Sequence, residues 1–587
     1  MALVFPFPTP FGLGDMVWSV HQALIVDALA AVGVHLYCRK NEPEDYWKLS
    51  AVLLALPLVP ASLLTHHIPS LLLCLFIAFA VFFAALFSSM MLYRISPLHP
   101  LAGYPGPLLW RVTKFSAAYY GAFGKYHIKL KQLHDRYGPI VRIGPNELSI
   151  VQVELIPQIL GSQGMPKGPL WEGRRILPSK NFNINNHLIG VRDLQRHAQL
   201  RKPWNKAFGV GPLKDYEEML RSRAGMMGSR LDEICGEGVG RVDLTEWTSF
   251  FAFDFMGDIA FTSDFSLLQN GDVNGFVRDM EEAQSLPTIV QHVPWLAKIT
   301  RVTPFLGTKL RKFGGFALEQ AKKRAGKPML KKDLFYHLIQ AVDPEFMSNP
   351  LPFIMANAVL TILAGSDTTS SSMAMIFFNL LREPRCYKKL QKEIDVSVAE
   401  AGGSIPSMEK LGQLPYLNAV INEAMRLQAP VPTSVQRAPK IGSGGKMLGS
   451  MFLPEGTNVQ VPPYVLHRDP RYFYPNPDSF WPERWLSQES WASGDDGDAS
   501  DRNGQEGAGG IIHERAAFIP FSTGPAACAG KPLALMELRY VTAMLLRKFN
   551  FAFQAGFNAE KWEAGLADRL TMFRGPLPVE ITRRGSI

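Results

Sequence analysis

Long apolar runs dominate the first 95 positions of the chain. They lie at 17–36, 49–64 and 71–92, with short polar segments between them. The third run carries no charge and is long enough for a membrane-spanning helix. Asp27 interrupts the first run, and two prolines interrupt the second. The pattern predicts a membrane anchor over residues 1–95, with up to three transmembrane helices or a single one at 71–92.

The basic residues of this region indicate its orientation. Arg39, Lys40 and Lys48 lie between the first two runs, and Arg94 follows the third. With three spans, all of them face the cytoplasm, as the positive-inside rule requires. A single span at 71–92 gives the same orientation to the rest of the chain. A cleaved signal peptide is disfavoured because no basic residue precedes Arg39. We expect the main domain on the cytoplasmic side.

After the anchor, the apolar spacing becomes mostly helical. Residues 96–107 hold four prolines and two glycines, which predicts a stiff hinge. Residues 351–383 form one long apolar segment typical of a buried helix. Residues 140–151 alternate around a Gly-Pro-Asn turn, which predicts a β-hairpin. The expected fold is mainly α with small β-sheets, and the catalytic domain is expected at 108–587.

Composition narrows the class of protein. The chain has 587 residues, is 47% hydrophobic and carries a formal net charge of +9. Its basic residues are scattered among acidic ones, so no nucleic-acid partner is expected. The glycine- and acid-rich segment 487–510 predicts a flexible surface insertion. Five widely spaced cysteines without a C-x-x-C pair argue against disulfides and zinc, and for a reducing compartment.

One of these cysteines stands in a specific setting. Phe521, Gly524, Cys528 and Gly530 follow the spacing F-x-x-G-x-x-x-C-x-G, directly before a helix-forming run at 533–549. The start of a helix favours a thiolate over a thiol. A thiolate there suits the axial ligand of a haem iron. A buried structural cysteine is the alternative interpretation.

A second chemical segment lies inside the long apolar helix, at 364–369, with the sequence Ala-Gly-Ser-Asp-Thr-Thr. Gly365 leaves space that would suit a diatomic ligand beside a metal. Asp367 and Thr368 offer an acid and an alcohol for proton delivery. A polar kink in a core helix is the alternative.

Two charged pairs share helix faces. His197 and Arg201, at i and i+4, can point together at one anionic group, although a solvated helix face would show the same spacing. Glu423 and Arg426, at i and i+3, can form a charge-assisted pair. That spacing alone carries little information.

Taken together and in this order, the motifs resemble those of the cytochrome P450 family, over roughly residues 97–580. The cysteine loop resembles the haem-binding segment of the family, and residues 364–369 match its oxygen-activation motif at every position. The resemblance implies a cytochrome P450 fold preceded by transmembrane helices. It also implies heme b with Cys528 as the axial iron ligand, and Phe521, Gly524 and Gly530 as further cofactor-binding residues of the same loop.

Further roles come from the same resemblance. His197, Arg201 and Arg437 are expected to bind the haem propionates. Glu423 and Arg426 are expected to form a structural triad with Arg484. The chain departs from the family at Ala526, where an arginine or histidine usually pairs with a propionate. That contact must be absent or supplied from elsewhere.

The resemblance implies a haem-thiolate monooxygenase that inserts one oxygen atom of O2 into an apolar small molecule, with protons relayed by Asp367 and Thr368. Electrons would come from NADPH through a separate NADPH-cytochrome P450 reductase, with cytochrome b5 as a second candidate donor. The lipid bilayer of the endoplasmic reticulum is the expected location. The several apolar runs at the N-terminus and the Gly-Pro-Ala-Ala-Cys loop look most like those of fungal members of the family. Many fungal members carry out tailoring steps in the biosynthesis of secondary metabolites.

Two other functions remain open. One is a haem-thiolate isomerase or dehydratase that uses a peroxide and no reductase. The other is a non-catalytic haem protein, such as a sensor or an electron carrier. The pair Asp367 and Thr368 disfavours both, because an acid and an alcohol beside the iron serve oxygen activation.

Overall fold

The computed structural model describes residues 18–41, 46–174, 187–263, 265–303, 305–325, 332–342, 351–433, 436–486 and 511–585. The insertion predicted at 487–510 lies outside them. The chain divides into two compact units, Met1–Gly103 and Tyr104–Ile587. The boundary falls within the proline-rich segment that the sequence predicts as a hinge.

The described residues of the first unit form the helices α1 (Val20–Lys40), α2 (Tyr46–Ala55), α3 (Leu58–Leu64) and α4 (Leu71–Ile95). Within the described ranges, three helical stretches are long and apolar enough to cross a membrane, namely Val20–Lys40, Trp47–Leu64 and Leu71–Ile95. They coincide with the three apolar runs of the sequence. The second stretch is interrupted between α2 and α3, where Pro57 lacks the N–H that a continuous helix needs.

Small residues allow α1 and α4 to approach each other. Ala23 and Ala31 of α1 and Ala78 of α4 are all buried in this unit. His35 Nδ1 lies 2.7 Å from Ser89 Oγ and joins the two helices. The Asp27 side chain is buried as well, and its carboxylate has no hydrogen-bond partner among the described residues.

The second unit is mainly helical, as predicted. Its first helices are α5 (Leu108–Val112), α6 (Phe115–Ala122), α7 (Tyr126–Tyr137), α8 (Ile156–Leu160), α9 (Leu170–Gly173), α10 (Leu194–Ala207), α11 (Val210–Cys235), α12 (Leu244–Met256) and α13 (Leu267–Asn270). These are followed by α14 (Phe276–Ala283), α15 (Ser285–Val290), α16 (Leu296–Val302), α17 (Thr308–Ala325), α18 (Leu334–Ala341), α19 (Leu351–Arg382), α20 (Pro384–Glu400), α21 (Met408–Gln413), α22 (Pro415–Leu427), α23 (Pro463–Leu466), α25 (Lys531–Lys548) and α26 (Ala559–Gly565).

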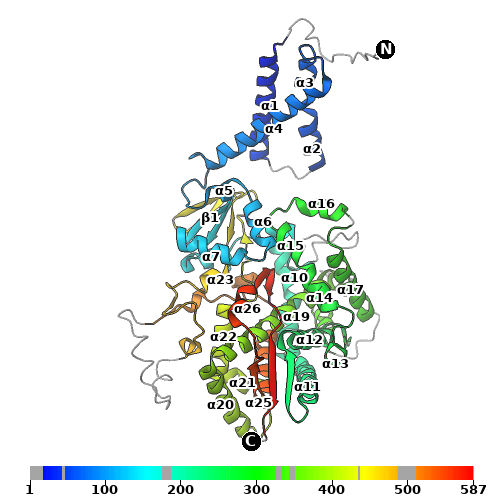
Figure 1. The fold of residues 1–587 in the computed structure, drawn as a ribbon, viewed down its shortest axis with the longest axis vertical. Helices are drawn as coiled ribbons and strands as arrows, with labels where there is room; N and C mark the ends of the chain where they lie inside the picture. Colours follow the sequence, from blue (N-terminus) through cyan, green and yellow to red (C-terminus); the bar gives the residue numbers. More distant parts are fainter. Residues whose placement is uncertain are drawn as a thin grey trace. The chain divides into compact units, whose positions relative to one another are not determined.

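The strands form small sheets. They are β1 (Ile140–Gly144), β2 (Glu147–Ile150), β3 (Val239–Asp243), β4 (Gln436–Arg437), β5 (Gly445–Leu448), β6 (Met451–Pro454), β7 (Asn458–Gln460), β8 (Phe473–Tyr474), β9 (Ile512–His513), β10 (Phe549–Phe553), β11 (Ala567–Arg569), β12 (Thr571–Phe573) and β13 (Pro578–Arg583). The largest has the order β1-β2-β7-β4 and begins with the predicted antiparallel hairpin. In Figure 1, β1 and helices α5–α7 lie at one end of this unit, and α20, α21 and α25 lie at the other.

Helix α19 is the central element of the core. It corresponds to the long helix predicted from the sequence, and it ends at Arg382 because Pro384 begins the next helix. Every residue from 369 to 380 is buried. Helices α12, α17, α22 and α25 all contact it. The packing therefore fixes the backbone that carries Asp367 and Thr368.

Candidate active site

The cysteine loop is held by its own backbone. The Cys528 N–H donates to the Phe521 carbonyl at 2.8 Å, and the Ala527 N–H donates to the Gly524 carbonyl at 3.0 Å. Gly530 then caps α25. These bonds place the cysteine three residues before Lys531, the first residue of α25, so it stands directly ahead of a helix, as the sequence predicts.

Cys528 is exposed at this loop, yet the protein around its sulfur desolvates the thiol. Burial raises the pKa of the Cys528 thiol, while the N–H groups of Gly530 and Lys531 and the Arg201 guanidinium act in the opposite direction. The donors at the helix start favour the thiolate form. A metal bound to the sulfur would shift the balance further, since a coordinating thiol is deprotonated.

The two glycines of the motif have different roles. Gly524 has φ +72°, and a Cβ there would overlap the Leu160 carbonyl oxygen at the end of α8. A Cβ at Gly530 would meet only Phe208, at 3.9 Å. Gly524 is thus required by the protein itself. The Phe521 ring lies 5.7 Å from Lys531 Nζ and packs against the core.

Helix α10 faces this loop through Arg201. The Arg201 side chain donates to Asn205 Oδ1 at 2.6 Å and to the Ala527 carbonyl. His197, one turn earlier, is buried. The indole N–H of Trp204 on the same helix is also buried and has no partner among the described residues. The predicted pair thus lies on a helix that contacts the cysteine loop.

Arg437 lies on β4, and its Nη1 donates to the Gln436 carbonyl at 3.1 Å. It pairs in an isolated antiparallel β-bridge with Lys167, a residue that the sequence analysis missed. Lys167 is only 8% exposed, and its Nζ donates to the carbonyls of Leu188 and Ile189, each at 2.9 Å. No local signal marked it, because the pairing depends on chain segments far apart in sequence.

Four basic groups, Lys167, His197, Arg201 and Arg437, influence one another's pKa. Burial lowers the pKa of Lys167 to about 7, helped by the charges of Arg437 and Arg201. Burial also lowers the pKa of His197 to about 4, with further contributions from Lys167, Arg201 and Arg437. No carboxylate of the described residues contributes to either shift. With Arg201 and Arg437 charged and no described carboxylate beside them, the cluster suits an anion.

The acid and the alcohol of α19 point in different directions. The Thr368 hydroxyl donates to the Ala364 carbonyl at 2.6 Å. Thr368 is half-buried and Ala364 is exposed, so this short stretch of a core helix leaves one face uncovered by protein. Asp367 is buried, and no hydrogen bond between described residues joins it to Thr368.

Asp367 is instead held by three residues that the sequence analysis did not identify. Gln284 donates to Asp367 Oδ2 at 3.2 Å, and the Thr571 hydroxyl also hydrogen-bonds to this oxygen. Arg574 Nη1 lies 3.4 Å from Asp367 Oδ1. All three are buried. The carboxylate therefore belongs to a closed polar network at the side of α19.

Gly365 differs from the sequence-based expectation. A Cβ on Gly365 would overlap the sulfur of Met256 on α12 and would lie 2.7 Å from its methyl carbon. The space at Gly365 is thus taken by a side chain of the neighbouring helix, and it does not supply room for a ligand. The glycine allows α12 and α19 to pack closely.

The three residues predicted as a triad are brought together. Glu423 Oε1 lies 2.8 Å from Arg426 Nη2 and 3.0 Å from Arg484 Nε, and all three side chains are buried. Trp481 N–H and Trp485 Nε1 also donate to this carboxylate, each at 2.9 Å. Burial alone would raise the pKa of Glu423, but Arg426 and Arg484 hold it at about 2. The ion pair locks α22 to the segment before the cysteine loop.

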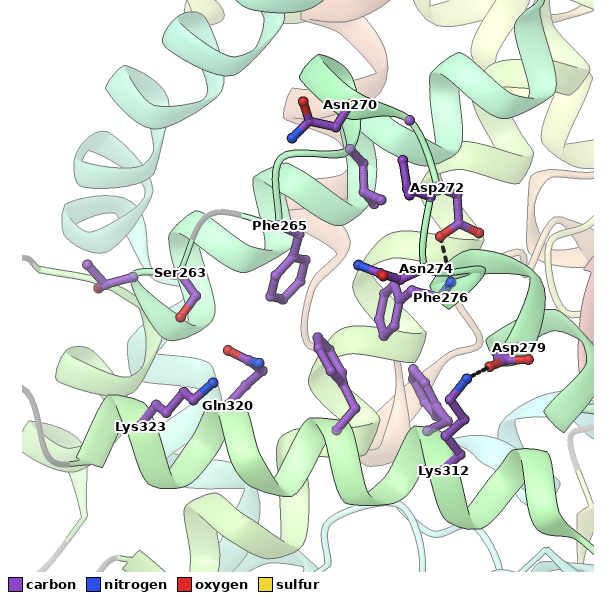
Figure 2. A pocket seen from close by; sticks show the side chains of 16 residues that line it. Ser263, Phe265, Asn270, Asp272, Asn274, Phe276, Asp279, Lys312, Gln320 and Lys323 are labelled. Atoms are coloured by element: carbon purple, nitrogen blue, oxygen red, sulfur yellow. Dashed lines mark hydrogen bonds and ion pairs between the residues drawn. The ribbon is translucent and has the colours of Figure 1, made fainter.

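A cavity of about 1050 Å³ lies elsewhere, beside α13, α14 and α17 (Figure 2). The rings of Phe265 and Phe276 face it, and Asp279 pairs with Lys312 at its edge. None of the residues predicted for the site lines this cavity. The cavity is therefore distinct from the cysteine loop and from the segment of α19 that carries Asp367 and Thr368.

The residues at the cysteine loop fit a haem. Cys528 offers a thiol with backbone N–H donors around it. The Arg201 and Arg437 guanidinium groups, with Lys167 and His197 as further donors, suit two carboxylate side chains. Helix α19 presents the uncovered Ala364 and Thr368. The donor set is that of a haem-thiolate protein. Ala526 is half-buried and brings no charge, as the sequence indicated.

Comparison with known proteins agrees with this assignment of a haem-thiolate site. The family model of cytochrome P450 matches residues 100–567. Cytochrome P450 monooxygenase FCK2 of Fusarium pseudograminearum is 32% identical over 84% of each chain. Tryprostatin B 6-hydroxylase of Neosartorya fischeri is 31% identical over 85% of each chain. Cytochrome P450 monooxygenase lcsK of Purpureocillium lilacinum is 28% identical over 97% of this chain and 99% of its own.

The mainly helical fold, the cysteine loop and the two helix motifs therefore have one explanation: the chain belongs to the cytochrome P450 family, whose members are oxygen-incorporating oxidoreductases with a haem-thiolate cofactor.

Proposed function

We propose that this protein is a membrane-anchored monooxygenase that oxidises an apolar small molecule in a tailoring step of fungal secondary metabolism. The observation that carries the reaction class is the exposed Cys528 thiol at the start of α25, with Arg201 bonded to its loop. The relatives support the substrate class, since one is named for the hydroxylation of tryprostatin B.

In this proposal Cys528 ligates the haem iron, and His197, Arg201 and Arg437 neutralise the propionates. When bound, the haem supplies oxygen activation, which thiolate donation favours. Thr368 lies on the uncovered face of α19 and presents its hydroxyl there. Asp367 lies in the polar network behind that face, and together with Thr368 it relays protons for oxygen activation.

Electrons come from NADPH through a separate NADPH-cytochrome P450 reductase, with cytochrome b5 as a second candidate donor. The anchor at 1–95 spans the endoplasmic reticulum membrane, the hinge occupies 96–107, and the catalytic domain at 108–587 faces the cytoplasm. The positions of Arg39, Lys40 and Lys48 support this orientation.

The absorption spectrum of the reduced, carbon-monoxide-bound protein tests the thiolate. We expect a strongly red-shifted Soret band in the wild type and its loss in Cys528→His. A histidine-type band in the folded wild type would contradict the proposal. Oxygen incorporation is then checked with a reductase, NADPH and ¹⁸O2. Product formation with a peroxide alone, without a label from O2, would favour an isomerase or dehydratase instead.

A further inference from the structure

Lys167 is a buried lysine with an unusual position. It pairs with Arg437 in an antiparallel β-bridge, and residues that lie opposite each other in such a bridge project their side chains to the same side. Hydrogen bonds fix the bridge, because the Ala438 N–H donates to the Pro166 carbonyl at 3.0 Å and the Gly168 N–H donates to the Gln436 carbonyl at 3.3 Å. The two cations are therefore held near each other by the backbone.

The surroundings of Lys167 contain more positive charge. Arg201 and Arg437 both lower its pKa, and Lys167 in turn lowers that of His197. Burying like charges together is unfavourable unless an anion compensates them. No carboxylate of the described residues takes part in this cluster. A bound anion would compensate this charge and favour the protonated form of Lys167.

The geometry of Lys167 leaves it able to bind such an anion. An ammonium group has three donors. Two are directed at the carbonyls of Leu188 and Ile189, each at 2.9 Å. One N–H remains for a further acceptor. The two carbonyl bonds also hold the side chain in place, which lowers the entropic cost of binding.

We propose that Lys167 binds a haem propionate and supplies the positive charge that Ala526 does not provide at the cysteine loop. This inference rests on the proposed haem site. If it holds, the segment between α8 and α9, which carries Lys167, also binds the cofactor. The competing interpretation is that Lys167 only anchors the turn at 187–190 through its carbonyl bonds.

Three variants separate the two interpretations. Lys167→Met removes the charge and the donors, and Lys167→Arg keeps the charge. Lys446→Met is the control, because Lys446 likewise donates to a backbone carbonyl, that of Gln163, but lies outside the cation cluster. The readouts on the haem-loaded proteins are the rate of haem transfer to excess apomyoglobin, the reduction potential, and the propionate bending mode in the resonance Raman spectrum.

We expect Lys167→Met to lose haem about tenfold faster, since one hydrogen bond to a charged group contributes on that order. Its reduction potential should fall, because the propionate charge is no longer compensated. Lys167→Arg should retain haem and shift only the Raman mode, and Lys446→Met should match the wild type in all three measurements.

Unchanged Raman modes and potentials in both Lys167 variants would overturn the proposal and leave the anchoring role. If Lys167→Met does not load haem, the propionate bending mode of Lys167→Arg decides between the two interpretations. A shifted mode supports propionate binding, and an unchanged mode overturns it. A wild type without a thiolate-type carbon monoxide spectrum would instead contradict the proposed function, so the two failures are distinguishable.

Discussion

The Thr571 hydroxyl hydrogen-bonds to the Asp367 carboxylate across 204 positions of sequence. Thr571 Oγ1 also lies 3.0 Å from Gln284 Oε1. With Asp367 ionised, Thr571 donates to it. With Asp367 protonated, the carboxyl donates to Thr571, and Thr571 donates to Gln284. A single rotation of one hydroxyl thus serves both protonation states of the acid.

This arrangement predicts that Thr571→Val weakens proton delivery. Loss of one bond to a buried carboxylate should lower the coupled rate about tenfold, with a matching rise in hydrogen peroxide per NADPH. The measurement is the ratio of product to NADPH consumed, together with the solvent isotope effect. Thr433→Val is the control, because Thr433 also donates to a buried carboxylate, that of Asp568. Equal coupling in the two variants would rule out a role for Thr571 in the relay.

The sequence predicts those parts of the site that are local. The cysteine loop, the helix that carries Asp367 and the i, i+3 pair of Glu423 and Arg426 are each encoded within a few residues. The hydrophobic period places these segments on helices. The family resemblance then supplied Arg484 and Arg437, which local spacing alone does not connect.

The parts that failed or were missed depend on tertiary packing. Gly365 suggested free space, but whether a glycine faces a ligand or a side chain is decided by the neighbouring helix, which places Met256 there. Gln284, Thr571 and Arg574, which hold Asp367, were missed because they come from distant parts of the chain. Lys167 had no local signal, because its pairing with Arg437 joins chain segments far apart in sequence.

The buried ion pair of Glu423 leads to a stability prediction. Glu423→Gln removes the charge that Arg426 and Arg484 share and leaves two buried guanidinium groups uncompensated. We expect a loss of about 3–5 kcal/mol in the free energy of unfolding. Chemical denaturation measures it. Glu580→Gln is the control, since the pair of Glu580 with Arg241 lies at the surface and should contribute less than about 1 kcal/mol.

The same pair predicts a pH dependence. The pKa of Glu423 is about 2 in the folded protein, below its ordinary value of 4.5. A lowered folded pKa contributes stability above the unfolded value, and that stability is lost as the pH falls toward the folded one. The difference between wild type and Glu423→Gln should therefore be constant above about pH 5.5 and narrow below it. A difference that stays constant down to pH 4 would contradict the assigned pKa.

The two motif glycines should respond differently to alanine. Gly524→Ala would force a left-handed backbone on a residue with a Cβ and overlap the Leu160 carbonyl. We expect a loss of about 2–4 kcal/mol from these two effects together. Gly530→Ala, with φ near −81° and only Phe208 nearby, should be nearly neutral for folding. Thermal denaturation of both variants checks the contrast, and equal losses would show that the two glycines are needed for the same reason.

The anchor gives a prediction about topology. With three spans, the segment between α1 and α2 faces the cytoplasm with Arg39, Lys40 and Lys48, and the segment between α3 and α4 faces the lumen. A glycosylation acceptor on a flexible linker, inserted after His67, should therefore be modified, whereas the same insert after Asn41 should not. A single span at α4 would leave both inserts in the lumen, and both would be glycosylated. The measurement is a mobility shift that an endoglycosidase removes. Modification of neither insert would contradict both topologies, because each places His67 in the lumen.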